Sequence, residues 1–131
     1  MRHRTTVKVR FYELDPYDHV NHSIYIQYFE AARAEWLTEI GYPLSRMKED
    51  GIQIVVTDLN TRYLGSAGPN DELVVESELV ELRRVSMTFE QRISRGDEVL
   101  VTQTISAAAV TPAGRPTRIP DALGKALQAP S

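Results

Sequence analysis

The sequence predicts an α+β fold, in which one long helix packs against an antiparallel sheet of about five strands. Two observations lead to this fold class. A helical pattern of apolar residues covers Ile24–Ile40. Almost everything after Gly51 shows the alternation and short turns of strands that follow one another along the chain. The 131 residues contain no internal repeat and no linker, which suits a single domain over residues 1–131.

The first strand is expected before the helix. Val7, Val9 and Phe11 alternate with charged and polar residues, which is the two-residue period of a half-buried strand. The Asp15-Pro16 pair ends this pattern.

The helix that follows is rich in aromatic residues. Asn21 or Ser23 can cap its start, and Gly41 can end it. At about 100° per residue, one arc of the helix holds Tyr25, Tyr28, Phe29, Ala32, Trp36 and Ile40. Because a buried aromatic side chain covers roughly 150–250 Å², we expect the sheet to enclose this helix almost completely.

Strand patterns then dominate the chain. They cover Ile52–Leu64, Glu72–Leu82, Ser86–Ser94 and Glu98–Thr111. Short helical segments are expected at Leu44–Asp50 and after Pro120. A small sheet that covers so apolar a helix leaves a strand edge or face for a partner, so we expect a homo-oligomer, either a dimer or a tetramer.

Composition and charge exclude several function classes. Fifteen Lys and Arg against 18 Asp and Glu give a net charge of −3, so the basic excess of a nucleic-acid groove is missing and no nucleic-acid partner is expected. Cysteine is absent, which excludes disulfides, zinc–thiolate sites and cysteine nucleophiles. No apolar run approaches the roughly 18 residues of a membrane helix, and no signal-peptide pattern is seen. We therefore expect a cytoplasmic protein without membrane insertion.

The residues that can carry chemistry gather at the strand-to-helix junction, residues 12–25. This segment holds two Asp, one Glu, two His and one Asn. Such a junction places side chains beside a helix N-terminus, whose free N–H groups and dipole favour developing negative charge. A carboxylate that attacks or activates water, next to donors aimed at an oxyanion, is a minimal acyl-transfer site.

The residues alone leave three interpretations of this junction open. Asp15 and Asp18 can be turn residues and Asn21 the helix cap, since these residue types favour such positions. His19 and His22 lie three residues apart near carboxylates and can hold a metal ion. The third interpretation is catalysis by a carboxylate. A Ser-His-Asp triad is poorly supported, because the Gly-x-Ser-x-Gly motif is absent.

The junction resembles the signature of the 4-hydroxybenzoyl-CoA thioesterase-like acyl-CoA thioesterases and of the Tol-Pal-associated thioesterases among them. The matching run is Phe11-Tyr-Glu-Leu-Asp15-Pro-Tyr-Asp-His19-Val-Asn21-His22-Ser-Ile-Tyr25-Ile-Gln-Tyr28-Phe-Glu-Ala-Ala-Arg33. A strand with Tyr63 before a small-residue loop and Asp71, and the run Gly114-Arg-Pro-Thr-Arg118-Ile-Pro120, agree with it. The resemblance implies a hotdog fold, a five-stranded antiparallel sheet wrapped around one long central helix. It also implies dimers that pair their sheets edge to edge, often associated into tetramers, with active sites between subunits.

The resemblance further implies the catalytic residues. Asp15 matches the family's catalytic carboxylate, and His22 falls on the helix-start position whose backbone N–H polarises the thioester carbonyl. No metal and no cofactor are implied. Many members read Gly-His-Val-Asn-Asn where this chain has Asp18-His19-Val20-Asn21-His22. The extra carboxylate weakens the inference about the substrate more than the inference about catalysis.

Other residues are assigned to substrate binding. They are Asn21, Tyr25, Tyr63, Arg84 and Arg118, the two arginines for the phosphates of CoA. Tyr25 also suits the core, and the two arginines also suit a solvated face. Arg33 lies on the apolar arc of the helix, and we expect it to pair with a carboxylate, because an unpaired buried charge is unfavourable.

These expectations lead to an acyl-CoA thioesterase that releases a free acid and CoA, with Asp15 as nucleophile or general base. Two alternatives stay open. One is a thioesterase acting on acyl groups carried by acyl carrier protein, and the other is a non-catalytic hotdog protein that binds acyl thioesters.

Overall fold

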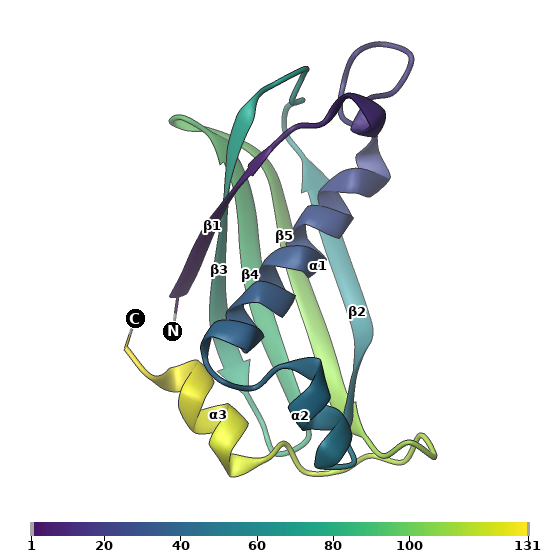
Figure 1. Ribbon diagram of the computed structural model, residues 1–131, viewed down its shortest axis with the longest axis vertical. Coiled ribbons are helices and arrows are strands. Elements are labelled where there is room, and N and C mark those ends of the chain that lie inside the picture. The colour runs from purple at the N-terminus through teal and green to yellow at the C-terminus, as the bar shows by residue number, and fades with distance from the viewer. Residues whose placement is uncertain (1, 131) are drawn as a thin grey trace.

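The computed structural model describes residues 2–130; Met1 and Ser131, which the predicted domain range 1–131 includes, lie outside them. Its elements in chain order are β1 (Arg2–Lys8), the 3-10 helix η1 (Phe11–Glu13), α1 (His22–Glu39), α2 (Leu44–Glu49), β2 (Gln53–Tyr63), β3 (Glu72–Leu82), β4 (Ser86–Arg95), β5 (Glu98–Val110) and α3 (Asp121–Gln128). The strands form one antiparallel sheet in the order β1-β3-β4-β5-β2. The predicted α+β class and five-stranded antiparallel sheet are confirmed, and α1 lies across one face of the sheet (Figure 1).

The first strand lies earlier in the chain than predicted. Phe11 is 86% exposed and belongs to η1, not to a strand. The backbone N–H and the guanidinium of Arg10 both donate to the Glu13 carboxylate, at 2.8 and 3.1 Å, and these bonds hold the chain in a 3-10 turn. β1 instead runs through the charged N-terminal residues, where Arg2 lies opposite Glu78 of β3 and pairs with it at 2.9 Å. Opposite charges facing each other across two strands stabilise such a pair.

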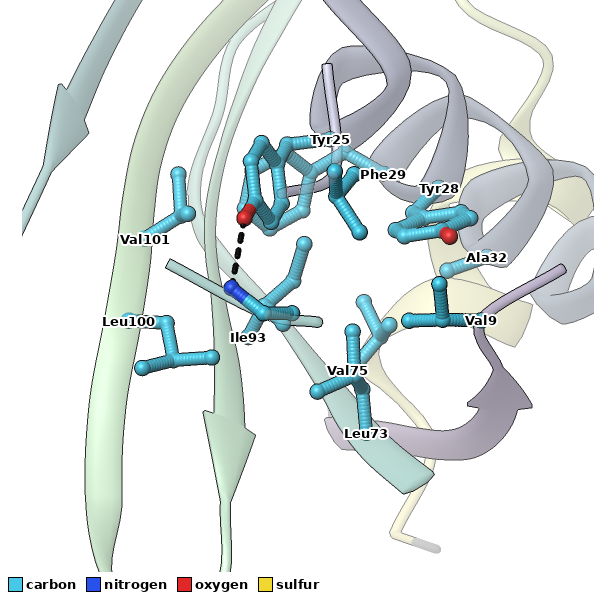
Figure 2. Packing of buried hydrophobic residues seen from close by; sticks show 12 residues of the cluster. Val9, Tyr25, Tyr28, Phe29, Ala32, Leu73, Val75, Ile93, Leu100 and Val101 are labelled. Atoms are coloured by element: carbon cyan, nitrogen blue, oxygen red, sulfur yellow. Dashed lines mark hydrogen bonds between the residues drawn. The ribbon is translucent and has the colours of Figure 1, made fainter. Parts of the chain in front are cut away.

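The long helix α1 begins and ends where its sequence signals indicate. The Asn21 side chain accepts the Ser23 N–H at 3.0 Å as the N-cap, and Gly41 follows the helix with φ +81°, a conformation that favours glycine. The buried side chains of α1 are Tyr25, Tyr28, Phe29, Ala32 and Trp36. Several of them are seen packed against strand residues in Figure 2. No helix among residues 2–130 is both long and apolar enough to cross a membrane.

The sheet covers only one side of α1 in the single chain. Gln27, Glu30 and Ala34 are exposed, and Glu30 and Ala34 line a cavity that also includes residues of β2 and β5. The expectation that the sheet encloses the helix almost completely is therefore wrong for one chain. The reason is that all the aromatic residues of α1 fall on one arc, so a single face of the sheet is enough to bury them.

A line of polar side chains crosses the sheet beneath α1, and we call it the polar row. It consists of Ser77 on β3, Gln91 on β4, Gln103 on β5 and Thr61 on β2, with Arg33 of α1 above it. Each strand residue faces the next in register. The Gln91 amide donates to Ser77 at 2.8 Å, and the Gln103 amide donates to Thr61 at 2.9 Å. The apolar core is divided into two clusters, one toward each end of α1.

The edge strand β2 is much more exposed than the other long strands. Its partner on one side is β5, and its other side has no strand among the described residues. Large apolar side chains are exposed along β2 and just after it; they are Val55, Val56, Leu59, Tyr63 and Leu64. An edge of this length with apolar side chains is a typical pairing surface for another chain.

Candidate active site

Asp15 lies in a tightly bonded turn between η1 and α1. Its Oδ1 accepts the backbone N–H groups of Tyr17 and His19 at 2.8 and 3.1 Å, and Asp18 in the same turn has φ +59°. The turn role considered from the sequence is therefore present. No hydrogen bond to Oδ2 of Asp15 occurs within the described part of the chain. One carboxylate oxygen thus fixes the turn, while the other has no hydrogen bond among the described residues.

Glu13 fastens this turn to the helix. Its side chain is buried, and its Oε1 accepts the Tyr28 hydroxyl at 2.7 Å in addition to the two Arg10 bonds. Its backbone carbonyl accepts the N–H of Asn21, the residue before α1, at 2.9 Å. Burial and the Glu13 carboxylate raise the pKa of the Tyr28 hydroxyl, so this hydroxyl stays a donor. Sequence reasoning did not assign this role to Glu13, because its partner lies 15 residues further along the chain.

The start of α1 supplies one free backbone donor among the described residues. Asn21 Oδ1 accepts both the N–H and the hydroxyl of Ser23, whereas the N–H of His22 has no partner among residues 2–130. The His22 ring is exposed. An uncapped N–H in the first turn points along the helix dipole and favours an anion or a polarised carbonyl oxygen.

Tyr63 of β2 is joined to the same helix start. Its hydroxyl donates to the backbone carbonyl of His22 at 2.8 Å, and its ring lies 5.8 Å from that of Tyr25. Tyr25 is itself buried, and its hydroxyl oxygen accepts the Ala67 N–H at 2.8 Å (Figure 2). Burial raises the pKa of Tyr25. The structure therefore brings Asn21, Tyr63 and Tyr25 to the helix start. There Tyr25 is part of the core and the Asn21 side chain is the helix cap.

The loop at residues 65–71 is hydrogen-bonded to the segment that carries the Asp15 turn. The Ala67 carbonyl accepts the N–H of Val20 at 2.9 Å. Asp71 holds the loop, since its Oδ2 accepts the Gly68 N–H at 2.8 Å and an Arg95 N–H at 2.7 Å. These bonds lower the pKa of the Asp71 carboxyl. The segment that carries Asp15 is thus held by a second loop, and the ion pair between Asp71 and Arg95 stabilises that loop.

The arginines assigned to CoA phosphates lie at the other end of the sheet. Arg84 follows β3 and Arg118 precedes α3. Both line an open groove of ≈ 520 Å³ that also includes Arg83 and Lys125. The 65–71 loop precedes β3, and the 11 residues of β3 span roughly 36 Å at about 3.3 Å per residue. The structure gathers these cations in one groove but does not bring them to Asp15 of the same chain.

The structure also bears on the expectations for Arg33 and for the two histidines of the junction. Arg33 donates to amide oxygens of Gln91 and Gln103, at 2.7 and 3.3 Å, instead of to the expected carboxylate. Burial lowers the pKa of Arg33. His19 is exposed in the Asp15 turn. It belongs to no group of three metal-ligating side chains in the described residues, and neither does His22.

The arrangement at the start of α1 has the parts needed for acyl transfer. It presents a carboxylate with one free oxygen and an unpaired backbone N–H on the same turn-to-helix segment. Thioester hydrolysis needs a weak base or nucleophile and a donor for the carbonyl oxygen, because a thiolate is a good leaving group.

Comparison with known proteins bears on this site. Residues 9–127 match the family model described as thioesterase-like superfamily. The long-chain acyl-CoA thioesterase FadM of Escherichia coli K12 is 33% identical over 108 residues, covering 82% of this chain and 79% of FadM. The acyl-CoA thioesterase YbgC of Haemophilus influenzae is 31% identical over 105 residues, covering 79% and 77%.

A solved structure gives the same result for the fold. The thioesterase from Thermus thermophilus complexed with coenzyme A and Zn has a TM-score of 0.83 and 28% identity, covering 96% of this chain and 91% of that one. The family match spans nearly all of the described elements, including the Asp15 turn. The chain belongs to the thioesterase-like superfamily.

Proposed function

We propose that this protein hydrolyses acyl-CoA thioesters to a free acid and CoA, with Asp15 as the catalytic carboxylate. One observation carries the proposal: Asp15 keeps a free carboxylate oxygen beside a helix start whose first N–H, that of His22, is unpaired among the described residues. The acyl-CoA thioesterases FadM and YbgC, similar over most of the chain, support the reaction class.

The reaction follows from these groups. The thioester carbonyl oxygen accepts the His22 N–H, which stabilises the negative charge that develops on it. In one route, Asp15 takes a proton from water while the water oxygen bonds to the carbonyl carbon. The C–S bond then breaks, and the departing CoA thiolate takes up the proton. In the other route, an oxygen of Asp15 bonds to the carbonyl carbon and the C–S bond breaks, which releases the CoA thiolate and leaves a mixed anhydride. Water then hydrolyses the anhydride to the free acid and the Asp15 carboxylate, and the proton set free passes to the thiolate. Mass spectrometry of single-turnover protein separates the routes, because only the second acylates Asp15.

We further propose that the working site is formed between copies of this chain. Arg84 and Arg118 lie at the opposite end of β3 from the loop that supports the Asp15 turn, so the proposal is that a second copy presents them to the phosphates of the bound CoA. Pairing of two copies along the exposed edge of β2 would continue the sheet from one chain into the other and cover the apolar side chains along that edge.

The acyl group and its carrier are identified by direct assay. A panel of acyl-CoA thioesters with short, long and aromatic acyl groups is incubated with the protein, and the released thiol is measured. Asp15→Asn keeps the shape and removes the charge, so kcat should fall about 100-fold or more with folding retained. Glu72→Gln, at an exposed strand residue, is the matched control.

The outcomes distinguish the alternatives. Turnover of acyl groups on acyl carrier protein but not on CoA would assign the biosynthetic alternative. Binding of acyl-CoA without thiol release would assign the non-catalytic one. If Asp15→Asn retains near-normal kcat, the chemistry lies with another group. Cytoplasmic location stays a prediction.

A further inference from the structure

His3 is a buried histidine whose ring nitrogens lack hydrogen bonds within residues 2–130. Its side chain, on β1, is only 4% exposed. Its ring stacks on Trp36 of α1 with the centroids 5.9 Å apart and the planes 12° from parallel. Neither Nδ1 nor Nε2 has a hydrogen-bond partner in the described part of the chain. Buried polar atoms are normally hydrogen-bonded, so this imidazole, which has the Glu39 carboxylate beside it but no hydrogen bond, can take a ligand.

Two carboxylates of α1 lie beside this ring. Glu35 and Glu39 are one helical turn apart, so they occupy the same face of the helix. Glu39 Oε2 is 2.9 Å from His3 Nε2, but the contact does not form a hydrogen bond. One oxygen of each glutamate and one ring nitrogen of His3 all lie within 4.8 Å of one another. Like charges at this helical spacing repel, and a shared cation would remove that repulsion.

The three ligand atoms indicate which kind of metal ion would bind. One imidazole nitrogen and two carboxylate oxygens are ligands that Zn²⁺ binds at about 2.0–2.2 Å. Ligand atoms around a tetrahedral ion at such distances are roughly 3.3 Å apart, so small rotations of the exposed Glu35 and Glu39 side chains suffice. A neutral imidazole and two carboxylates also balance the 2+ charge. Mg²⁺ and Ca²⁺ prefer sites made of oxygen ligands alone.

We propose that His3, Glu35 and Glu39 form a binding site for a divalent transition-metal ion of the Zn²⁺ type. The ion would join the N-terminal strand β1 to the last turns of α1. Glu35 lies 13 residues beyond His22, about 20 Å along the helix at 1.5 Å per residue. The site is thus separate from the Asp15 turn. Its role is to stabilise the fold, and the proposal does not depend on the proposed hydrolysis.

The test is titration of the untagged, chelator-treated full chain with ZnCl₂ in a calorimeter, together with thermal unfolding with and without the ion. One Zn²⁺ per chain and a raised Tm are expected. Co²⁺ bound in its place should show the visible absorption of a tetrahedral site. Glu35→Gln and Glu39→Gln alter exposed side chains and should weaken Zn²⁺ binding 10-fold or more. Glu35→Gln, which removes no ion pair with His3, should leave the metal-free Tm nearly unchanged.

Two variants complete the design. His3→Phe keeps an aromatic ring against Trp36 and removes both nitrogens, so it should abolish Zn²⁺ binding. Glu30→Gln, on the exposed side of the same helix, should bind Zn²⁺ like the parent chain. The proposal is overturned if the parent chain binds no Zn²⁺ at micromolar concentration. It is equally overturned if all three site variants retain the parent's affinity, which would place the ion elsewhere, for example at His19 or His22.

Discussion

The bond between Tyr28 and Glu13 is a contact by which the Asp15 turn is held to the helix. Tyr28→Phe removes only the hydroxyl, which donates to Glu13 Oε1 at 2.7 Å. The ring still fills its place in the core. Glu13 keeps the two Arg10 donors, so its charge loses one of three hydrogen bonds to the side chain.

The magnitude follows from the burial of both partners. A hydrogen bond to a charged group contributes about 1.5–3 kcal/mol to the free energy of unfolding. For a chain of this length, each kcal/mol changes Tm by roughly 3–5 °C. Tyr28→Phe should therefore lower Tm by about 5–15 °C. Because Asp15 follows Glu13 by two residues, kcat should also fall, with KM less affected, since Glu13 positions the turn without touching the substrate.

Urea unfolding followed by circular dichroism, together with the thiol-release assay, measures both effects. Tyr12→Phe is the matched control, since Tyr12 is 68% exposed and removing its hydroxyl should change neither quantity. If Tyr28→Phe unfolds at the same urea concentration as Tyr12→Phe, the Tyr28–Glu13 bond contributes nothing and the account of Glu13 as a fastening residue fails.

Four further outcomes are expected. Asn21→Ala removes the helix cap and should cost about 0.5–2 kcal/mol in urea unfolding, whereas His22→Ala should leave kcat nearly intact; a large kcat loss in His22→Ala would make the imidazole a participant. The folded state lowers the pKa of Asp71, so the stability it provides is present above the unfolded-state pKa and is lost as pH falls through the lower, folded-state value. Acid unfolding of Asp71→Asn should therefore depend less on pH in that range, and an unchanged profile would contradict the role of the Arg95 pair. Val56→Lys, at an exposed apolar residue of β2, should shift the protein toward monomer in sedimentation and reduce activity; a parent chain that sediments as a fully active monomer would exclude a site shared between copies.

The sheet was largely predictable because its signals are local. β3 has the predicted bounds, and the other strands after the helix end within a residue of their predicted ends. Arg95-Gly96-Asp97 marks a hairpin in the sequence, and Gly96 indeed has φ +58°. The first strand was misplaced because the alternation continues through Phe11. The bonds between Arg10 and Glu13 that break it cannot be seen in a two-residue period.

The candidate site was likewise predictable only where its residues are close together in the sequence. Asp15, Asn21 and His22 were found together because they are neighbours in one short segment. The partners of Arg33 were missed, since Gln91 and Gln103 come from strands 58 and 70 residues away. Only the pairing of β4 with β5 places them under the helix. The same holds for the contact of His3 with Glu39, which depends on where β1 packs against α1.

The polar row has a consequence for how reliably the strands find their alignment during folding. Gln91 faces Gln103 in the native pairing, and a slip of two residues would set it against Val101 or Ile105 instead. A slip of one residue would turn every side chain of the strand to the opposite face. In a two-residue slip, similar apolar contacts would partly replace the native ones. The hydrophobic contribution to stability therefore differs little between the native and the slipped alignment. The amide groups discriminate strongly, because misalignment leaves buried donors and the Arg33 charge without acceptors. Replacing the row by apolar residues of similar volume is therefore expected to yield a chain that still collapses but populates misaligned sheets, visible as doubled amide resonances for β4 and β5.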